Sequence, residues 1–574
     1  MLPARLDTFL IRLRRLSTSR WFWLGFPILL YSWTLTGPFI VDDIHLLLKA
    51  ESYRDGRSPA LDLYRFARTD AEWNNLRNRG VCPWWVESGR LDFVRPIGAW
   101  SFYFDTVLFG RNVLAFRLMS LAVFAGALLA VHWMFRATGA DTARAGAATF
   151  FMGISQTATP PVTWMCSRAD LFVLIGAAMT AGAYWSIRKR PGLRWFVLGA
   201  LAFTLALFSK EFAVALCPVI VLHELITWRK SATRASRSFA AMILLLSIAY
   251  LAYYIQSRPW IASGADHMPS QLAGLWPRSI LLYLSVWTLG FPIDILLAAN
   301  SIQVWTVALI GGGIALLVIR YLRRSARNDA ATLFFAIWAI AFILPPLRAM
   351  SASTRSLCVA TVGWTYLLTS LILPPTEKDV VVPRLFRHFL FTANGMASIG
   401  CVIATVLYMN ITERRAQDRL LQVCRTIPGG VHDGDLLVIT QAESTADLMC
   451  SGDRLEFLTG VRNVSTTHLL PAGIEASAEV EDSHTVLVRA KNHSLFDSAL
   501  HHLTLPSGWQ PELGQEFRLK DCTVKIAQIS DKGGVDAIRV LFAEPLNSTR
   551  VHFIPPADAE SPDSRARLVH AKSL

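Results

Sequence analysis

The sequence is short of charged side chains. Only 17% of its 574 residues are Asp, Glu, Lys or Arg, whereas 53% are hydrophobic. An ordinary soluble domain carries about 25% charged residues. The apolar residues also gather in runs too long for the helices of a soluble core, and runs of about 20 apolar residues are typical of membrane-spanning helices. The sequence therefore predicts a polytopic α-helical membrane protein.

Several patterns with known chemistry are also missing. The eight cysteines show no Cys-x-x-Cys pair and no metal-ligand spacing, which disfavours a zinc site or a disulfide framework. There is no glycine-rich phosphate-binding loop, which disfavours a nucleotide-sugar donor. We therefore expect no cofactor, and the sequence supports no metal site.

The excess of positive charge does not indicate nucleic-acid binding. The chain has 56 Lys and Arg against 42 Asp and Glu, a net charge of +14. Such a balance in a soluble protein points first to nucleic acid. Here the basic residues cluster beside apolar runs, as the preference of cytoplasmic loops for Lys and Arg predicts. We expect membrane lipids as partners and no nucleic acid.

The positions of the basic residues predict the topology. Arginines precede the first apolar run and hold the N-terminus in the cytoplasm. The run lacks a small-residue cleavage site, so we expect an uncleaved first span. A span at 280–298 would place the later arginine cluster outside, so we expect an interfacial or re-entrant element there. The sequence then predicts about eleven spans: 21–41, 113–135, 143–157, 169–187, 193–208, 212–228, 239–255, 304–319, 333–344, 357–373 and 389–409.

The character of the chain changes near residue 411. We expect a membrane domain at 1–411, with a first outer loop at 42–112, and a soluble extracytoplasmic domain at 412–555. That domain reads as β-rich or α/β, because short apolar runs at 436–440, 485–489 and 538–542 alternate with turn residues. A charged helix is expected at 413–425, and a disordered polar tail at 556–574. The membrane is predicted to be a plasma, inner or endoplasmic reticulum membrane.

Ionisable residues stand at the predicted outer ends of several apolar runs. Charged groups at membrane depth are costly and usually serve function. Because each marks the same side of the membrane, we expect them to converge on one layer. They are Asp42, Asp43, Arg95, Arg168, Asp170, Lys210, Glu211 and Arg355.

One carboxylate with several cations suits sugar transfer from a lipid-linked phosphate. A hydroxyl is a poor nucleophile near neutral pH, so a carboxylate must take its proton. The leaving phosphate is a weak base and needs charge stabilisation, which Lys and Arg supply. A general base and a group of cations are therefore a sufficient set.

Each residue also has a purely structural explanation. Asp43 is placed to cap a surface helix. Arg168 and Arg355 are placed to anchor helix ends by reaching the interface. Lys210 and Glu211 are placed to form an interfacial ion pair. The shared side of the membrane is what favours a common site.

Five motifs follow one another along the chain. In order, they are Val41-Asp42-Asp43, Arg95-Pro96-Ile97 through Phe109-Gly110, Ser167-Arg168-Ala169-Asp170-Leu171, Phe208-Ser209-Lys210-Glu211, and Arg355 with Val362-Gly363-Trp364. They resemble those of membrane glycosyltransferases with the GT-C fold, above all the protein O-mannosyltransferases of the tetratricopeptide-bearing branch. The resemblance covers 21–373.

The resemblance implies roles for these residues. An Asp of the acidic pair would be the catalytic base, and Arg168, Lys210 and Arg355 would hold the donor phosphate. Arg95, Asp170 and Glu211 would support them. The donor would be a polyprenyl-phosphate sugar such as mannose, the acceptor a hydroxyl on protein, glycan or lipid, and the anomeric configuration would invert. The chain departs from the family in lacking tetratricopeptide repeats, and in having Ser356 and Cys358 where tyrosines are usual.

Two other functions are compatible with the composition. A transporter or lipid flippase would explain the spans, but it predicts discontinuous helices in two related halves near mid-bilayer. The sequence shows no such pairing. A membrane anchor that displays the C-terminal domain as a binding module would leave the acidic pair dispensable.

Overall fold

The computed structural model describes most of the chain. The described residues are 11–229, 232–258, 276–294, 301–326, 329–348, 353–373, 382–427, 429–442, 449–471, 474–491, 494–496, 501, 505, 509–531 and 533–554. The predicted tail at 556–574 and the end of the 280–298 segment lie outside them.

The chain divides into two compact units. We call the first the helical unit, which takes 1–37, 94–262 and 273–408. The second, the mixed unit, takes 38–93, 263–272 and 409–574. The residues that follow the first apolar run therefore belong with the C-terminal part of the chain.

The helical unit is that of an integral membrane protein. Among the described residues, seven helices are long and apolar enough to cross a membrane: Val113–Thr138, Met165–Lys189, Arg234–Gln256, Ile302–Arg323, Ala330–Leu347, Thr354–Ile372 and Arg384–Thr426. A shorter apolar helix is Leu193–Ser209. Helices thus fall where the apolar runs predict them, while the total of about eleven spans stays a prediction.

Two predicted segments differ in detail. The first apolar run is broken into η1 (Trp21–Gly25), α2 (Phe26–Tyr31) and η2 (Ser32–Thr36). Pro27 lacks a backbone N–H, and Pro38 disfavours helix at the residue before it. At the other end, α19 (Ser398–Thr426) continues through the charged helix predicted at 413–425. No glycine or proline interrupts residues 401–426.

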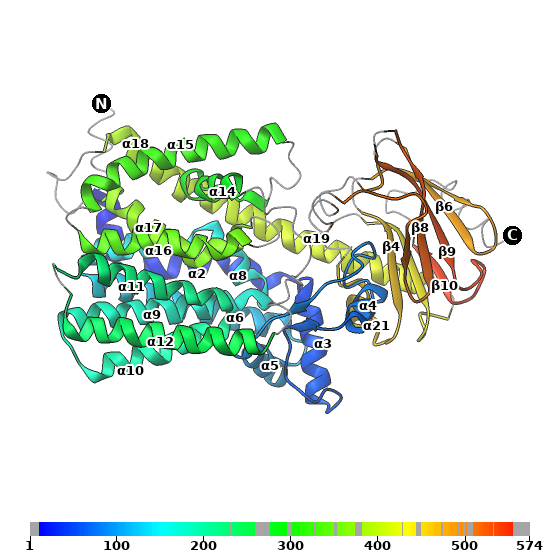
Figure 1. Ribbon diagram of the computed structural model, residues 1–574, viewed down its shortest axis with the longest axis horizontal. Coiled ribbons are helices and arrows are strands. Elements are labelled where there is room, and N and C mark those ends of the chain that lie inside the picture. The colour runs from blue at the N-terminus through cyan, green and yellow to red at the C-terminus, as the bar shows by residue number, and fades with distance from the viewer. Residues whose placement is uncertain are drawn as a thin grey trace. The chain divides into compact units, whose positions relative to one another are not determined.

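Close helix packing organises the helical unit. Helix α9 (Ala169–Lys189) packs against α6 (Val113–Thr138), α10 (Leu193–Ser209) and α12 (Arg234–Gln256), and α9, α10 and α12 run side by side in Figure 1. A Cβ atom on Gly176 would lie 2.4 Å from the Ala202 carbonyl oxygen, so the small residue permits the close approach of α9 and α10. The other main helices are α5 (Pro96–Phe109), α7 (Thr142–Gly153), α8 (Thr159–Thr163), α11 (Leu216–Thr227), α14 (Trp276–Leu289), α15 (Ser301–Ala326), α16 (Ala330–Ile343), α17 (Cys358–Ile372) and α18 (Arg384–Thr392).

The mixed unit combines helices with sheets. Its sheets are the parallel β10-β3-β4, the antiparallel β5-β6-β9-β8-β7 and the small pair β1-β2, and the later strands are labelled in Figure 1. The strand runs predicted at 436–440, 485–489 and 538–542 lie in β3, β6 and β9. The elements are α3 (Asp42–Arg54), β1 (Arg65–Ala67), α4 (Asp70–Asn78), β2 (Leu91–Asp92), β3 (Leu436–Gln441), α21 (Ser451–Thr459), β4 (Ser465–Leu470), β5 (Ala476–Val480), β6 (Thr485–Ala490), β7 (Glu516–Arg518), β8 (Cys522–Ile529), β9 (Val535–Phe542) and β10 (Val551–Ile554).

A buried ion pair ties the parts of the mixed unit together. Arg454 of α21 donates from Nε to Glu413 Oε1 at 2.6 Å and from Nη2 to Glu413 Oε2 at 2.9 Å. Both side chains are 1% exposed. The Val41 N–H also donates to Glu413 Oε2, at 3.3 Å. One carboxylate thus joins α19, α21 and the segment before α3.

We expect Arg454→Met to destabilise the mixed unit by about 3–5 kcal/mol, because it leaves the Glu413 carboxylate buried without its cation. Adding Glu413→Gln should restore part of the loss. The measurement is the apparent Tm of the purified full-length protein in detergent. The matched control is Arg539→Ala, which breaks a solvent-screened pair with Glu481 and should lower the Tm much less. Equal losses of Tm for Arg454→Met and Arg539→Ala would contradict this account.

Candidate functional site

Four of the predicted residues form two ion pairs in the helical unit. Lys210 Nζ lies 2.8 Å from Asp170 Oδ1 and 3.0 Å from Oδ2. Arg95 binds Glu211 through two hydrogen bonds, Nη2 to Oε1 at 2.6 Å and Nε to Oε2 at 3.1 Å. The pairs neighbour each other, since Arg95 and Glu211 both act electrostatically on Lys210.

The local fold explains how these side chains meet. Arg190, Pro191 and Gly192 join α9 to α10, so the two helices are antiparallel and the first turn of α9 lies at the same end as the last turn of α10. Lys210 leaves the helix with an extended backbone, φ −162° and ψ 139°, and Glu211 begins η5 (Glu211–Ala215). Arg95 is the N-cap of α5, which Pro96 starts with its fixed φ.

The two pairs keep their charges in different ways. Burial raises the pKa of Glu211, but its charge interaction and hydrogen bonds with Arg95, with help from Lys210, outweigh burial and lower the pKa from 4.5 to about 2. Burial lowers the pKa of Lys210, Asp170 opposes that change, and the positive charges of Arg95 and Arg355 add to it. The net direction for Lys210 is downward, as expected for a cation among cations.

Arg355 adds an unbalanced positive charge to this group. It lies in η8 (Thr354–Leu357), with its guanidinium 4.7 Å from the centre of the Trp164 ring. Within the described ranges, no carboxylate pairs with Arg355. Arg95 and Lys210 are each matched by a carboxylate, so the group carries one excess positive charge. Such a group favours an anion.

Arg168, which the sequence places in the same layer, turns to other partners. It is the last residue of η4 (Met165–Arg168), and its side chain is 3% exposed. The guanidinium forms an ion pair with Asp105 of α5. Its other hydrogen bonds go to Ser120 Oγ at 3.1 Å, Ser101 Oγ at 3.3 Å and the Phe116 carbonyl oxygen at 3.1 Å. These four acceptors join Arg168 to α5 and α6.

The acidic pair belongs to the mixed unit, at the start of α3. Asp43 is 0% exposed, and its Oδ2 accepts the Ile40 N–H at 3.1 Å. Val41, directly before Asp42, has φ +42°, a conformation that costs a β-branched residue about 1–3 kcal/mol. The Cys450 thiol lies 3.8 Å from Asp42 Oδ1. Backbone strain beside a candidate catalytic group is typical of functional sites.

A second set of charges surrounds α3. His45 Nδ1 lies 2.7 Å from Asp453 Oδ2, and Arg79 bonds both Asp453 and Glu456. Burial raises the pKa of Asp453, but His45 and the arginines outweigh it, so the net pKa is lowered. His45 is 8% exposed, so it is a buried partner of a carboxylate and not a solvated helix residue.

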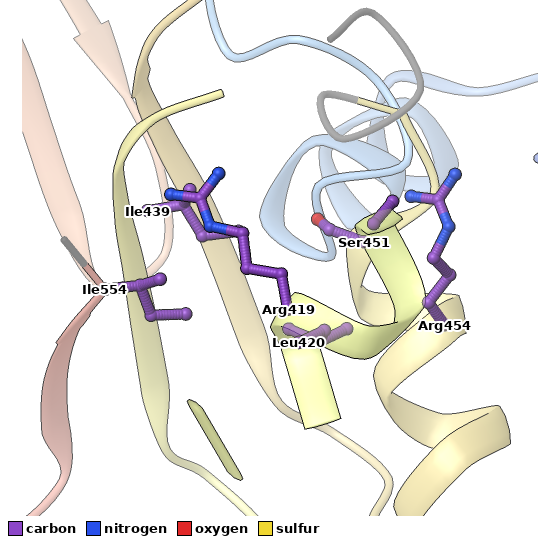
Figure 2. Close-up of a pocket in the computed structure, with 7 residues that line it drawn as sticks. Arg419, Leu420, Ile439, Ser451, Arg454 and Ile554 are labelled. Carbon is purple, nitrogen blue, oxygen red and sulfur yellow. The ribbon is translucent and has the colours of Figure 1, made fainter. Parts of the chain in front are cut away.

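The mixed unit also contains a small pocket between α19, α21 and the parallel sheet. Figure 2 shows Arg419 beside Ile439 on one side and Arg454 with Ser451 on the other. Its free volume of about 20 Å³ holds one water molecule. Arg419 donates to the Gln441 carbonyl oxygen at 3.1 Å, and Arg454 is paired with Glu413. The pocket is therefore too small and too well paired to be a substrate site.

Sequence reasoning missed several of these groups. Asp105 is the one carboxylate in the apolar run 96–109, and that isolation was an available signal for a buried partner. Trp164 follows the Pro160-Pro161 break, but nothing in its sequence context indicates its contact with Arg355. Cys450 and Asp453 lie far along the chain from α3, so no local pattern links them to Asp42 or His45.

The low pKa of Glu211 predicts a pH dependence. A carboxylate whose pKa is lowered on folding stabilises the fold fully above its ordinary pKa of 4.5, and that stabilisation is lost as the pH falls toward about 2. We expect the wild-type protein to melt at a higher temperature than Glu211→Gln at neutral pH. The gap should close as the pH falls from about 4.5 to about 2.5. A gap that stays constant over that range would show that Glu211 is not ionised beside Arg95.

The similarity of this chain to known proteins is a similarity of fold alone. No protein-family model matches the chain. No curated protein sequence matches it either. Among solved structures, ArnT from Cupriavidus metallidurans bound to undecaprenyl phosphate is similar with a TM-score of 0.41 and 13% identity, over 77% of this chain and 85% of that chain. AglB, an archaeal oligosaccharyltransferase from Archaeoglobus fulgidus in complex with an inhibitory peptide and a dolichol-phosphate, is similar with a TM-score of 0.45 and 12% identity. That match covers 78% of this chain and 64%, less than two thirds, of the archaeal chain.

Proposed function

We propose that the protein is an integral membrane glycosyltransferase. It would transfer a sugar, with mannose as one candidate, from a polyprenyl-phosphate carrier to a hydroxyl on protein, glycan or lipid. The observation that carries this proposal is the charge pattern of the helical unit. Two ion pairs hold Arg95, Asp170, Lys210 and Glu211 in place, and Arg355 stands beside them with no carboxylate partner among the described residues. An excess cation at the ends of apolar helices suits a lipid-linked anion.

The proposed reaction needs one base and one anion site. Asp42 or Asp43 takes the proton from the acceptor hydroxyl as its oxygen attacks the anomeric carbon. The bond from that carbon to the phosphate oxygen breaks, and the phosphate leaves with the bonding electrons. Attack opposite the leaving phosphate inverts the anomeric configuration. Lys210 and Arg355 stabilise the negative charge that develops on the phosphate.

The two aspartates differ in how deeply they are buried. Asp43 is fully buried and accepts a backbone N–H, which suits a residue that shapes the turn. Asp42 is half-buried and lies beside the Cys450 thiol. We favour Asp42 as the base and Asp43 as the residue that positions it. Val41, which lies between Ile40 and Asp42, has a strained backbone conformation. Such strain supports a turn that positions a catalytic group.

The role of Arg168 is better described as positioning. Its donors already serve Asp105, Ser101, Ser120 and the Phe116 carbonyl. A guanidinium with committed donors has little to offer a phosphate. We therefore assign Arg168 to holding α5 and α6 around the site, and keep Lys210 and Arg355 as the phosphate ligands.

The acidic pair provides the direct test. We expect Asp42→Asn to lower transfer from a radiolabelled polyprenyl-phosphate sugar by about 100-fold or more, because general-base catalysis contributes about 10²–10⁴. Asp43→Asn should lower transfer through misplacement of Asp42, with a larger loss of Tm. The control is Asp55→Asn, at the exposed end of the same helix, which should keep full activity. The assay is release of free polyprenyl phosphate by purified protein in the presence of acceptor-containing membranes.

Two outcomes would contradict the proposal. Full transfer by both Asp42→Asn and Asp43→Asn would remove the base from the account. Gradient-dependent uptake of a solute or lipid by reconstituted protein, without any release of polyprenyl phosphate, would favour the transporter or flippase.

A further inference from the structure

Trp164 stands where the chain changes direction beside Arg355. It follows α8, and its extended backbone, φ −103° and ψ 105°, separates α8 from η4. The indole ring faces the Arg355 guanidinium, 4.7 Å from its carbon. A cation over an aromatic face is attracted by the ring and keeps its full charge. The ring therefore holds Arg355 without neutralising it.

The indole N–H of Trp164 has no acceptor among the residues that the structure describes. Its nitrogen is buried and makes no hydrogen bond to them. Buried donors in folded proteins are nearly always paired, and an unpaired one destabilises the fold. An unpaired donor beside the candidate site is available to a partner that binds there.

The surroundings identify the chemistry of that partner. The neighbouring charged groups are Arg355, whose charge is unbalanced, and the Lys210–Asp170 pair, whose ammonium is within electrostatic range of Arg355. A guanidinium, an ammonium and an indole N–H are all donors, and none of them accepts. An oxyanion with several acceptor oxygens would pair them all.

A second tryptophan shows what this arrangement looks like without an anion site. Trp185 of α9 also has a buried, unpaired indole nitrogen, and the Arg188 guanidinium lies 5.6 Å from its ring. However, Arg188 is neutralised by Glu224, with Nη1 and Oε2 2.6 Å apart. The difference between the two places is the free charge on Arg355.

We propose that Trp164 is a phosphate-binding residue, whose indole N–H donates to an oxygen of the lipid-linked phosphate while its ring orients Arg355. The oxyanion's identity as a phosphate ester on a long apolar chain rests on the proposed function. The site would therefore bind the phosphate through three donor groups. Two are the cations Arg355 and Lys210, and the third is the neutral indole N–H of Trp164. Trp164 would add affinity for the phosphate and none for the lipid chain.

The test compares farnesyl phosphate with farnesol as probes for the purified full-length protein in nanodiscs. We expect Trp164→Phe to weaken binding of farnesyl phosphate by about tenfold or more, the factor expected for one hydrogen bond to a charged acceptor. Binding of farnesol should not change. The matched control is Trp185→Phe, which removes an equally unpaired indole N–H beside a neutralised arginine and should change neither.

The outcomes separate this inference from the proposed function. If Trp164→Phe binds farnesyl phosphate as the wild type does, while Arg355→Met weakens it, the inference is overturned and the proposed function stands. If the wild type binds farnesyl phosphate no better than farnesol, the proposed function fails and the inference fails with it. If Trp164→Phe does not fold, 3-benzothienylalanine at position 164 replaces the N–H by sulfur in a ring of nearly the same shape. Unchanged phosphate binding by that protein would overturn the inference.

Discussion

The ion pair between Lys210 and Asp170 joins the end of α10 to the start of α9, and Arg95, Glu211 and Arg355 lie within electrostatic range of it. A charge inside an apolar bundle is stable only when it is paired and hydrogen-bonded. Because α9 and α10 are antiparallel and packed closely at Gly176, their facing ends bring the two side chains together. Glu211 follows Lys210 directly, and its two hydrogen bonds to Arg95 fix the start of α5 beside the same helix ends.

The ion pairs of the helical unit match all but one of the cations in this group. Two carboxylates balance Arg95 and Lys210, and Arg355 remains positive against the ring of Trp164. In the mixed unit, a buried ion pair likewise holds the backbone just before the acidic pair in place. Glu413 is matched by Arg454 and also fixes the strained Val41 before Asp42. In both units, buried pairs set the geometry. The proposed chemistry uses Asp42 and Arg355 together with Lys210, which keeps its pair with Asp170.

The sequence could predict that several ionisable residues lie close together, but not which partner each of them takes. The apolar runs showed where helices lie, and residues at the ends of those runs included Arg95, Asp170, Lys210, Glu211 and Arg355, which the fold brings together. The sequence could not show that Arg168 bonds Asp105. The direction of a side chain at a helix end depends on its rotamer and on the local backbone, and a motif gives neither. Nor could it show that 38–93 fold with the C-terminal part, because those contacts join segments far apart in the chain.

We propose that the excess positive charge on Arg355, supported by Lys210, binds a lipid-linked phosphate. The most direct measurement is an electron cryo-microscopy structure of the purified full-length protein with farnesyl phosphate. We expect density for the phosphate in contact with the Arg355 guanidinium and the Lys210 ammonium. The ion pair between Lys210 and Asp170 should still be formed in that structure. Phosphate density elsewhere on the protein, with Arg355 still facing only Trp164, would contradict it.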